Sequence, residues 1–561
     1  VHTWGAKSYH SQVNLNRLSN MESLVMVSHL LDAVEIHGDL ENFVLEKTEG
    51  VPFFIEEFIR SLKDMKIIEK KGNQYLFAKD FPEMTIPSTI QDVIMARVDG
   101  LPEGAKEVIQ TGSVIEREFS YELIKRVTGL SEQELLSRLS ILKDSELLFE
   151  RGIYPDTIYI FKHALTREVV YDSILTRRRE ELHGDIGNAI EEIYKESIDE
   201  YYGVLAEHYI DSKNYEKGAD YSKLAERKAE KAASLNDAIS YAKKRISCLE
   251  KLPVDDDVEK KLISARTVLG LYYTQLMLPV KAKAAVDPII DLAIKHNYKR
   301  RISQINVILG CYYHSVNEDY PKALEYYEKA LKIGEELNDI LTIVLANNNM
   351  GHCLSTNGEF EKALPFYEKA LEINVMANVL CQKSNQLALA EAANSYLSAI
   401  YLDMGEYETS QKHDERAISF WQQSSMGSSY IMWNKISIEL AKVMNNEKDI
   451  NLNEIFKWHG DIKNKVTDGM SANLVGTILL HIDNQHISEA EDWIKKSIEA
   501  HNKYGMRWYL AKDYALYADL FKRKGELPKA QENLNKAIEI FTDCGADGWV
   551  DKYEKELASL S

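Results

Sequence analysis

The chain has 561 residues, and its 68 Lys and Arg against 88 Asp and Glu leave a net charge of −20. This acidity argues against general binding to nucleic acid or to an anionic membrane surface. Only 11 prolines and 27 glycines are present, and their scarcity favours long helices joined by short turns over a β-sandwich or a β-barrel.

The first region, 1–84, contains three predicted helices and one predicted strand. Apolar residues with helical spacing cover Met21–Leu31 and Leu40–Glu46. The turn signal Glu49-Gly50-Val51-Pro52 then precedes a third, amphipathic helix over Phe53–Lys66. The alternating run Tyr75-Leu76-Phe77 predicts an edge strand.

The second region, 85–180, has the element order of a winged-helix domain. Ser88 is expected to cap its first helix, and Ser131 with Glu134 forms a capping-box pattern. The predicted helices and the two strand-like runs that follow them cover Ile90–Val98, Ala105–Val114, Tyr121–Val127, Glu132–Lys143, Leu147–Arg151 and Thr157–Phe161. The last three of these helices, followed by a β-hairpin, predict a winged helix.

The third region, 181–561, is repetitive. A large residue followed by small residues three and ten positions later recurs from Tyr320, Phe360, Tyr407, Ile487 and Leu527, and with Gly218 and Ala225 from Tyr215. Small residues suit positions where two helices cross closely, and each helix pair must stack on its neighbours to bury its apolar face. We therefore predict a mainly α chain that ends in a helical solenoid.

These repeats resemble the tetratricopeptide (TPR) family. The resemblance is carried by Tyr320-Pro-Lys-Ala-Leu-Glu-Tyr-Tyr-Glu-Lys-Ala-Leu331 and by Phe360-Glu-Lys-Ala-Leu-Pro-Phe-Tyr-Glu-Lys-Ala-Leu371. The step of 40 residues from Tyr320 to Phe360 exceeds the usual repeat and implies longer helices. Two stretches, Asp255–Asn297 and Ser424–Val466, fit the pattern poorly and are interpreted as degenerate helix pairs.

No self-contained active site is visible in the sequence. The chain lacks the P-loop pattern G-x-x-x-x-G-K-[ST], a G-x-G-x-x-G, a G-x-S-x-G and an H-E-x-x-H. Glu56 and Glu57 are neighbours and are expected to point to different sides of their helix, so we do not interpret them as an acid/base pair. We therefore assign neither a catalytic residue nor a metal ligand to this chain.

Two short strings carry a second resemblance. One is Glu49-Gly50-Val51-Pro52-Phe53-Phe54-Ile55-Glu56-Glu57 and the other is Phe161-Lys-His163-Ala-Leu165-Thr-Arg167-Glu168-Val-Val-Tyr171. In this order, within Leu15–His183, they resemble the C-terminal half of a STAND-type signalling ATPase module, related to AAA modules and to LuxR/MalT-like regulators. The phrases Ile86–Arg97 and Val114–Phe119 are similar to the branch fused to class III adenylate or guanylate cyclases.

The resemblance implies a helical lid over 1–84, a winged helix over 85–180 and a TPR superhelix over 181–561. It implies that Gly50 and Pro52 belong to a Gly-x-Pro whose proline packs on adenine, and that His163 reaches the β-phosphate of ADP. The family's P-loop, its Mg²⁺-holding acidic strand and its sensor arginine would precede Val1. ATP or ADP with Mg²⁺ is accordingly expected only in a longer protein, with none bound by this chain alone.

The resemblance further implies a regulatory role. The expected partners are N-terminal NTPase and output domains and a protein or small-molecule ligand in the TPR groove. The expected output is a class III nucleotidyl cyclase; a protein kinase and a LuxR-type regulator are the alternatives. A TPR scaffold that does not depend on nucleotide is the second hypothesis.

Other features are assigned structural roles. The third helix of the winged-helix region is acidic, which disfavours DNA binding, and Arg177-Arg178-Arg179 is interpreted as a solvated helix face that pairs with Glu180 and Glu181. Asn349 alone does not make a carboxylate clamp. Five scattered cysteines without a C-x-x-C pair, and no apolar run of membrane-spanning length, favour a cytoplasmic protein.

Overall fold

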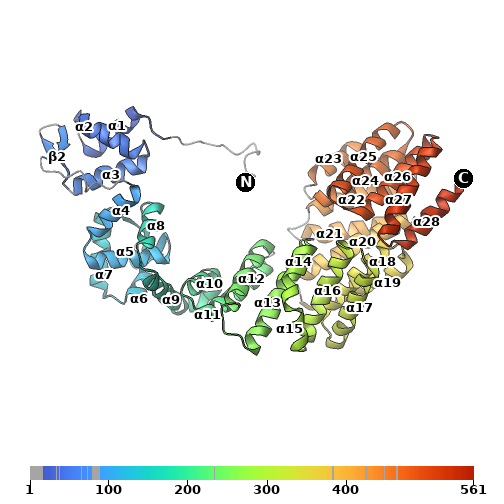
Figure 1. Ribbon diagram of the computed structural model, residues 1–561, viewed down its shortest axis with the longest axis horizontal. Coiled ribbons are helices and arrows are strands. Elements are labelled where there is room, and N and C mark those ends of the chain that lie inside the picture. The colour runs from blue at the N-terminus through green and yellow to red at the C-terminus, as the bar shows by residue number, and fades with distance from the viewer. Residues whose placement is uncertain are drawn as a thin grey trace. The chain divides into compact units, whose positions relative to one another are not determined.

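A computed structural model of the chain describes residues 17–32, 35–36, 38–64, 66–71, 74–78, 89–232, 234–381, 384–423, 428–447, 449–462 and 465–560. Helices dominate these residues, as the composition predicted (Figure 1). Packing divides the chain into two units, unit 1 over Val1–Gly218 and unit 2 over Ala219–Ser561. No helix among the described residues combines the length and the hydropathy that crossing a bilayer requires.

Unit 1 consists of short helices and two small sheets. Its elements are α1 (Asn20–Leu31), β1 (Glu35–Ile36), α2 (Gly38–Thr48), α3 (Pro52–Asp64), β2 (Ile68–Lys71), β3 (Gln74–Phe77), α4 (Ile90–Asp99), α5 (Glu103–Ile115), β4 (Glu118–Ser120), α6 (Tyr121–Thr128), α7 (Glu132–Asp144), β5 (Leu148–Arg151), β6 (Ile158–Phe161), α8 (Ala164–Asp172), α9 (Thr176–Ile193), the 3-10 helix η2 (Lys195–Tyr201), α10 (Tyr202–Asp211) and the start of α11 (Tyr215–Lys231).

The first sheet corrects one prediction. Its strand order is β1-β3-β2, so β3 is the central strand and not an edge. It pairs antiparallel with β2 and parallel with β1. The sequence gives no sign of this second partner because β1 has only two residues, too few to show alternation.

The second half of unit 1 follows the predicted order of helices and strands. Its sheet has the order β4-β6-β5 and includes β4, a three-residue strand that the sequence analysis missed. The capping box of Ser131 and Glu134 is confirmed at α7. Thr89 caps α4 by accepting from the Asp92 N–H, whereas Ser88, the expected cap, lies outside the described residues.

The apolar face of α3 fixes that helix in unit 1. Phe58, Ile59 and Leu62 are at most 1% exposed and pack in one core with residues of α1 and α2. The predicted spacing is thereby confirmed, and the opposite face of α3 is left for polar side chains.

Unit 2 consists of stacked helices. They are α12 (Leu235–Leu249), α13 (Asp256–Gln275), α14 (Pro279–Val286), the 3-10 helix η3 (Asp287–Ile289), α15 (Ile290–Lys295), α16 (Lys299–Ser315), α17 (Tyr320–Leu337), α18 (Ile340–Thr356), α19 (Phe360–Cys381), α20 (Ser384–Met404), α21 (Tyr407–Gln423), α22 (Ser428–Met444), α23 (Leu452–Asp461), α24 (Lys465–Ile482), α25 (Ile487–Lys503), α26 (Arg507–Arg523), α27 (Leu527–Asp543) and α28 (Asp547–Ser559).

The repeat register is confirmed at the level of single residues. The helices α11, α17, α19, α21, α25 and α27 begin at the large residues that open the repeats. The small residues Ala323, Ala363 and Ala530 are fully buried. At Gly351 a Cβ atom would lie 2.8 Å from the Tyr367 ring, so the crossing of α18 and α19 requires glycine.

The two poorly fitting stretches are irregular helix pairs, as predicted. In the first, the second helix is interrupted by η3, which contains Pro288. In the second, α23 is shorter than its counterparts in the other repeats.

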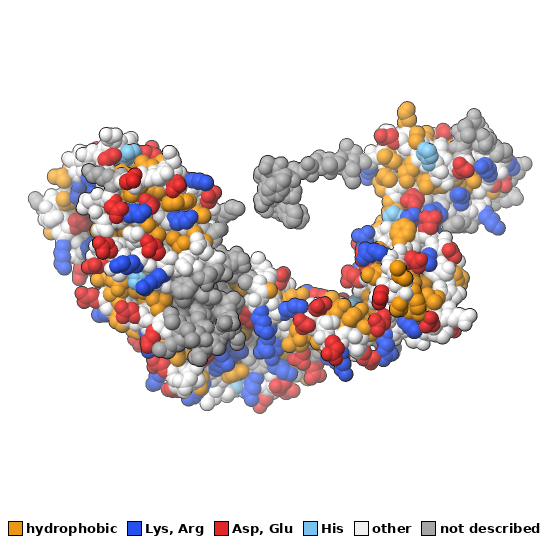
Figure 2. All heavy atoms as spheres, turned by 180° about the vertical axis from the view of Figure 1, so that it is seen from behind, with side chains coloured by type: hydrophobic (Ala, Val, Ile, Leu, Met, Phe, Trp, Pro, Cys, Tyr) orange, Lys and Arg blue, Asp and Glu red, His pale blue; other side chains and the backbone are white. Residues whose placement is uncertain are grey.

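On the face drawn in Figure 2, acidic and basic side chains alternate over the described surface instead of separating into patches.

Candidate functional site

The site begins at the turn before α3. Gly50 has φ +72° and is buried. Its carbonyl oxygen accepts from the Leu18 N–H at 2.8 Å, and a Cβ atom at Gly50 would lie 2.2 Å from the Leu18 oxygen. Only glycine therefore fits here. The turn sets the direction in which α3 starts.

Pro52 and His163 both lie near the first turn of α3, and Phe53 connects them. Pro52 opens the helix, where a missing N–H does no harm, and its side chain is exposed. The next residue, Phe53, stacks on the His163 imidazole with ring centroids 3.9 Å apart. His163 precedes α8 in extended conformation and follows β6 by two residues. The structure thus brings the two residues singled out in the sequence to one place.

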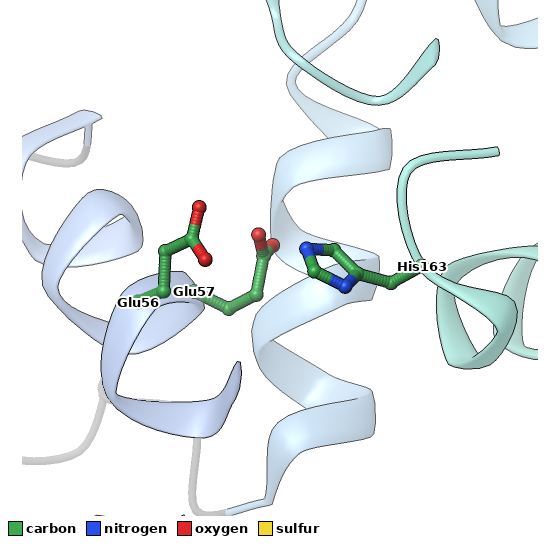
Figure 3. A group of neighbouring side chains, drawn as sticks. All are labelled: Glu56, Glu57 and His163. Atoms are coloured by element: carbon green, nitrogen blue, oxygen red, sulfur yellow. The ribbon is translucent and has the colours of Figure 1, made fainter. Parts of the chain in front are cut away.

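Two carboxylates of α3 face the same imidazole. Figure 3 shows Glu56 and Glu57 pointing toward His163, and the ligand atoms of the three residues all lie within 4.8 Å of one another. The expectation that Glu56 and Glu57 point to different sides of the helix is therefore wrong. The two side chains do leave the helix in different directions, but both are long enough to bend toward neighbouring cations.

Each carboxylate is already paired with a basic side chain. Glu57, 1% exposed, forms a buried ion pair with Arg97 of α4. Glu56 accepts from Lys162 Nζ at 2.5 Å, and Arg60 lies 3.7 Å away. Glu146, in the α7–β5 turn, binds Lys162 at 2.9 Å and Arg60 at 2.5 Å. We call these six residues with Phe53 and His163 the α3 junction.

The junction favours a neutral imidazole. Burial lowers the pKa of His163, and the charges of Lys162 and Arg60 act in the same direction, against Glu56 and Glu57. His163 Nε2 is buried and has no hydrogen-bond partner among the described residues. A buried polar atom without a partner marks a place where a ligand atom or a water molecule could bind.

The same geometry argues against a resident metal ion. Glu56, Glu57 and His163 supply donor types that bind divalent cations. Arg97 and Lys162, however, already neutralise the two carboxylates. A cation would have to displace both ion pairs and leave the buried guanidinium of Arg97 without a counter-charge, which is costly.

The other residues that the sequence analysis weighed have structural roles. Arg177 and Arg178 pair with Glu181 at 3.4 Å, and Arg179 pairs with Asp172. Asn349 donates to the Leu345 carbonyl oxygen at 2.7 Å, and its own side-chain oxygen contacts the Cys311 thiol. The predicted pairing is thus confirmed for Glu181 and wrong for Glu180, which pairs with Lys213.

The repeats also form a groove, between α25, α26 and α27. It has a volume of about 440 Å³ and is lined by Tyr514, Tyr517 and Phe521 together with Lys495, Lys529 and Lys536. The lysines pair with glutamates of their own helices. The groove therefore combines aromatic surface with paired lysines and with the carboxylate of Glu499.

Comparison with protein families identifies the type of repeat. Residues 308–374 match the tetratricopeptide repeat family. The chain therefore contains tetratricopeptide repeats, and the match covers the region from the middle of α16 into α19. A search of curated proteins found no match.

Several solved structures are similar to the chain at low identity. One is a signal transduction ATPase with numerous domains, with a tetratricopeptide repeat sensor, from Pyrococcus horikoshii. The match has 15% identity and a TM-score of 0.39, and it covers 97% of this chain and 75% of the Pyrococcus chain. The quorum sensor NprR from B. thuringiensis, in its apo form, is 13% identical and covers 65% of this chain and 100% of its own, with a TM-score of 0.43. A Rap protein in complex with competence and sporulation factor is 14% identical, covers 69% and 94%, and has a TM-score of 0.31.

Proposed function

We propose that this chain is the regulatory and sensor region of a STAND-type ATP-binding signalling protein. Its tetratricopeptide repeats bind a protein or small ligand, and unit 1 responds to a bound nucleotide. The observation that supports the proposal best is the buried, unpartnered Nε2 of His163 beside the first turn of α3. The resemblance assigns the phosphate contact to this histidine, and its unpartnered nitrogen leaves a hydrogen-bonding atom for that role.

Each residue of the site has a definite part in the proposal. The exposed ring of Pro52 offers a rigid apolar surface for adenine. His163, kept neutral by burial, donates a hydrogen bond from Nε2 to a phosphate oxygen. Gly50 fixes the turn that aims Pro52. When bound, ADP would supply the phosphate charge, and most of its affinity would come from a P-loop and Mg²⁺ outside this chain.

The test is nucleotide binding by the complete reading frame that encodes this chain. ADP affinity is measured by isothermal titration calorimetry for the parent protein and for His163→Ala. We expect the variant to bind ADP at least about tenfold more weakly, the loss that corresponds to one hydrogen bond to a charged group. His163→Gln, which retains a donor, should recover part of the affinity.

The matched control is His29→Ala, because His29 is an exposed histidine of α1 in the same unit. Its ADP affinity should equal that of the parent protein. Equal affinity in the parent and His163→Ala would overturn the role of His163. If the complete protein bound no ADP, the nucleotide-independent TPR scaffold would be the remaining hypothesis. The chain by itself should hydrolyse no ATP.

The proposed output is a class III nucleotidyl cyclase N-terminal to this chain. Formation of cyclic AMP or cyclic GMP by the complete protein, followed by chromatography of the products, tests it. Phosphorylation of protein in the same mixture, without any cyclic product, would support a protein kinase in its place.

A further inference from the structure

The last helices of unit 2 contact repeats that lie far earlier in the sequence. The Trp508 indole N–H donates to the Thr356 carbonyl oxygen at 2.7 Å across 152 positions. The backbone N–H of Gly548 donates to the Asn357 carbonyl oxygen at 3.0 Å, and that of Asp547 donates to the Asn357 side chain at 3.0 Å. Figure 1 shows α27 and α28 beside α18 and α19. We call these contacts the seam.

Aromatic rings fill the seam. The Trp549 side chain is 1% exposed. Its ring stacks on Phe541 at 5.6 Å and meets the edges of Phe360 at 5.5 Å and Trp508 at 5.9 Å. Phe360 begins α19 whereas the other three rings come from α26–α28, so the cluster joins distant parts of the superhelix. Aromatic clusters of this kind bury large apolar areas.

Charged and polar pairs flank the rings. Lys512 of α26 binds both carboxylate oxygens of Asp403, at the end of α20, at 2.9 and 3.0 Å. The Cys544 thiol donates to Glu318, in the turn after α16, at 3.0 Å. Three separate turns or helix ends of the early repeats thus have partners on α26–α28.

Two backbones approach closely at the seam. A Cβ atom at Gly548 would lie 2.7 Å from the Asn357 oxygen, and one at Gly358 would lie 2.9 Å from the Gly548 carbonyl carbon. Gly358 has φ +84° and would be strained by any side chain. Gly548 has no such restriction, so a substitution there tests the close approach alone.

The seam differs from the rest of the packing. Helices that pack extensively in unit 2 are near neighbours in the sequence, such as α16 with α17 and α26 with α27. Such packing lets a solenoid change its curvature by small rotations between repeats. Contacts that join residues more than 150 positions apart fix the curvature, and their loss would release it.

A row of rings from three successive repeats adjoins the seam at Thr356. His314 Nε2 bonds to the Thr356 hydroxyl at 3.2 Å. The His352 ring lies 4.7 Å from that of His314 and stacks on Tyr396 at 4.5 Å. Trp508 of α26 reaches the same place, because its N–H donates to the carbonyl oxygen of Thr356, the residue whose hydroxyl bonds to His314.

We propose that the seam is an autoinhibitory closure, in which α26–α28 hold the superhelix shut over His314, His352 and Tyr396. A partner of the repeats reaches this row after the seam has opened. The closure is a property of unit 2 and does not depend on nucleotide binding in unit 1.

The test compares Gly548→Ala with Gly460→Ala in this chain. A Cβ atom at Gly460 meets nothing within 4 Å, so the control adds the same methyl group in open space. In Gly548→Ala we expect the Asp547 and Gly548 amides to exchange hydrogen about tenfold faster, because they lose partners at the seam. We also expect a larger radius of gyration by small-angle X-ray scattering and faster modification of His314 and His352 by diethyl pyrocarbonate.

Trp508→Phe is the second variant, because it keeps a ring and removes the N–H that bonds to Thr356. We expect Trp508→Phe to show the same faster exchange, larger radius of gyration and faster histidine modification. It replaces Gly548→Ala in the test if that variant does not fold. Unchanged exchange at Asp547 and Gly548, or unchanged histidine modification, in a folded variant would overturn the closure. Uniformly faster exchange throughout unit 2 would also overturn it, since that result indicates general destabilisation.

Discussion

Asp414 on α21 shows how a single buried side chain can set the stability of a repeat. It is fully buried, and neither carboxylate oxygen has a hydrogen-bond partner among the described residues. Burial raises the pKa of this carboxyl from 3.8 to about 7. The folded chain therefore binds a proton that the unfolded chain releases between these values, and stability falls as the pH rises toward 7.

Asp414→Asn should remove this penalty. At pH 8 we expect the variant to unfold with a free energy about 2–4 kcal/mol higher than the parent, and at pH 4 the difference should fall below about 1 kcal/mol. Urea titrations at both pH values measure it. Asp551→Asn, at an exposed position of α28, should change nothing. A gain that is equal at pH 4 and pH 8 would contradict the assigned proton.

The sequence predicted part of the site at this scale. Gly50, Pro52 and His163 come from motifs, and each motif is local, so the residues could be selected without a structure. The convergence of Glu56 with Glu57 could not be foreseen. It depends on Lys162 and Arg97, which lie 106 and 40 positions away and draw the carboxylates together. The roles proposed for Gly50, Pro52 and His163 remain predictions.

At the scale of elements, helix starts followed the sequence closely. The large residue that opens each repeat and the small residues behind it act within one helix pair, so a local pattern carries the information. The order of the first sheet was wrong because a two-residue strand carries no pattern. The α3 junction is likewise tertiary: it connects α3, α4, the α7–β5 turn and the β6–α8 connection through side chains of widely separated segments.

Glu57 should hold α3 on α4. Glu57→Ala leaves the Arg97 guanidinium, 6% exposed, buried without a carboxylate. Breaking a buried pair in this way destabilises by about 3–5 kcal/mol. Urea unfolding followed by circular dichroism, with hydrogen exchange in α3 to assign the transition to unit 1, gives the value. The exposed Glu46 provides the control variant, Glu46→Ala. A loss below 1 kcal/mol would show that the pair contributes little.

At the scale of the whole molecule, buried histidines make the fold sensitive to acid. Burial lowers the pKa of His183 to about 4 and that of His208 to about 3, and their Nδ1 atoms are 2.8 Å apart. One must donate and the other accept, so a second proton breaks the bond. His352 and His413 in unit 2 are shifted by burial to about 4 as well.

The direction of the pH effect follows from these shifts. The unfolded histidines take up protons below their ordinary pKa of 6.5, whereas the folded ones remain neutral to about pH 4, so stability is lost as the pH falls through this window. Each buried imidazole should contribute a loss of about 2 kcal/mol between pH 7.5 and pH 5. Thermal unfolding at the two pH values, in the Asp414→Asn background to remove the opposing carboxyl, should show a lower Tm at pH 5. An equal Tm at the two pH values would contradict the predicted loss of stability in acid.

The repeats could be predicted from the sequence, but the seam could not, since nothing in a local pattern indicates that α28 meets the turn after α18. One of its members has a further consequence. Cys544 is fully buried, and burial and Glu318 raise the pKa of its thiol. A protonated, covered thiol is inert toward alkylating or disulfide reagents. The rate at which a thiol reagent modifies Cys544 in the native chain therefore reports how often the seam opens, without any engineered label.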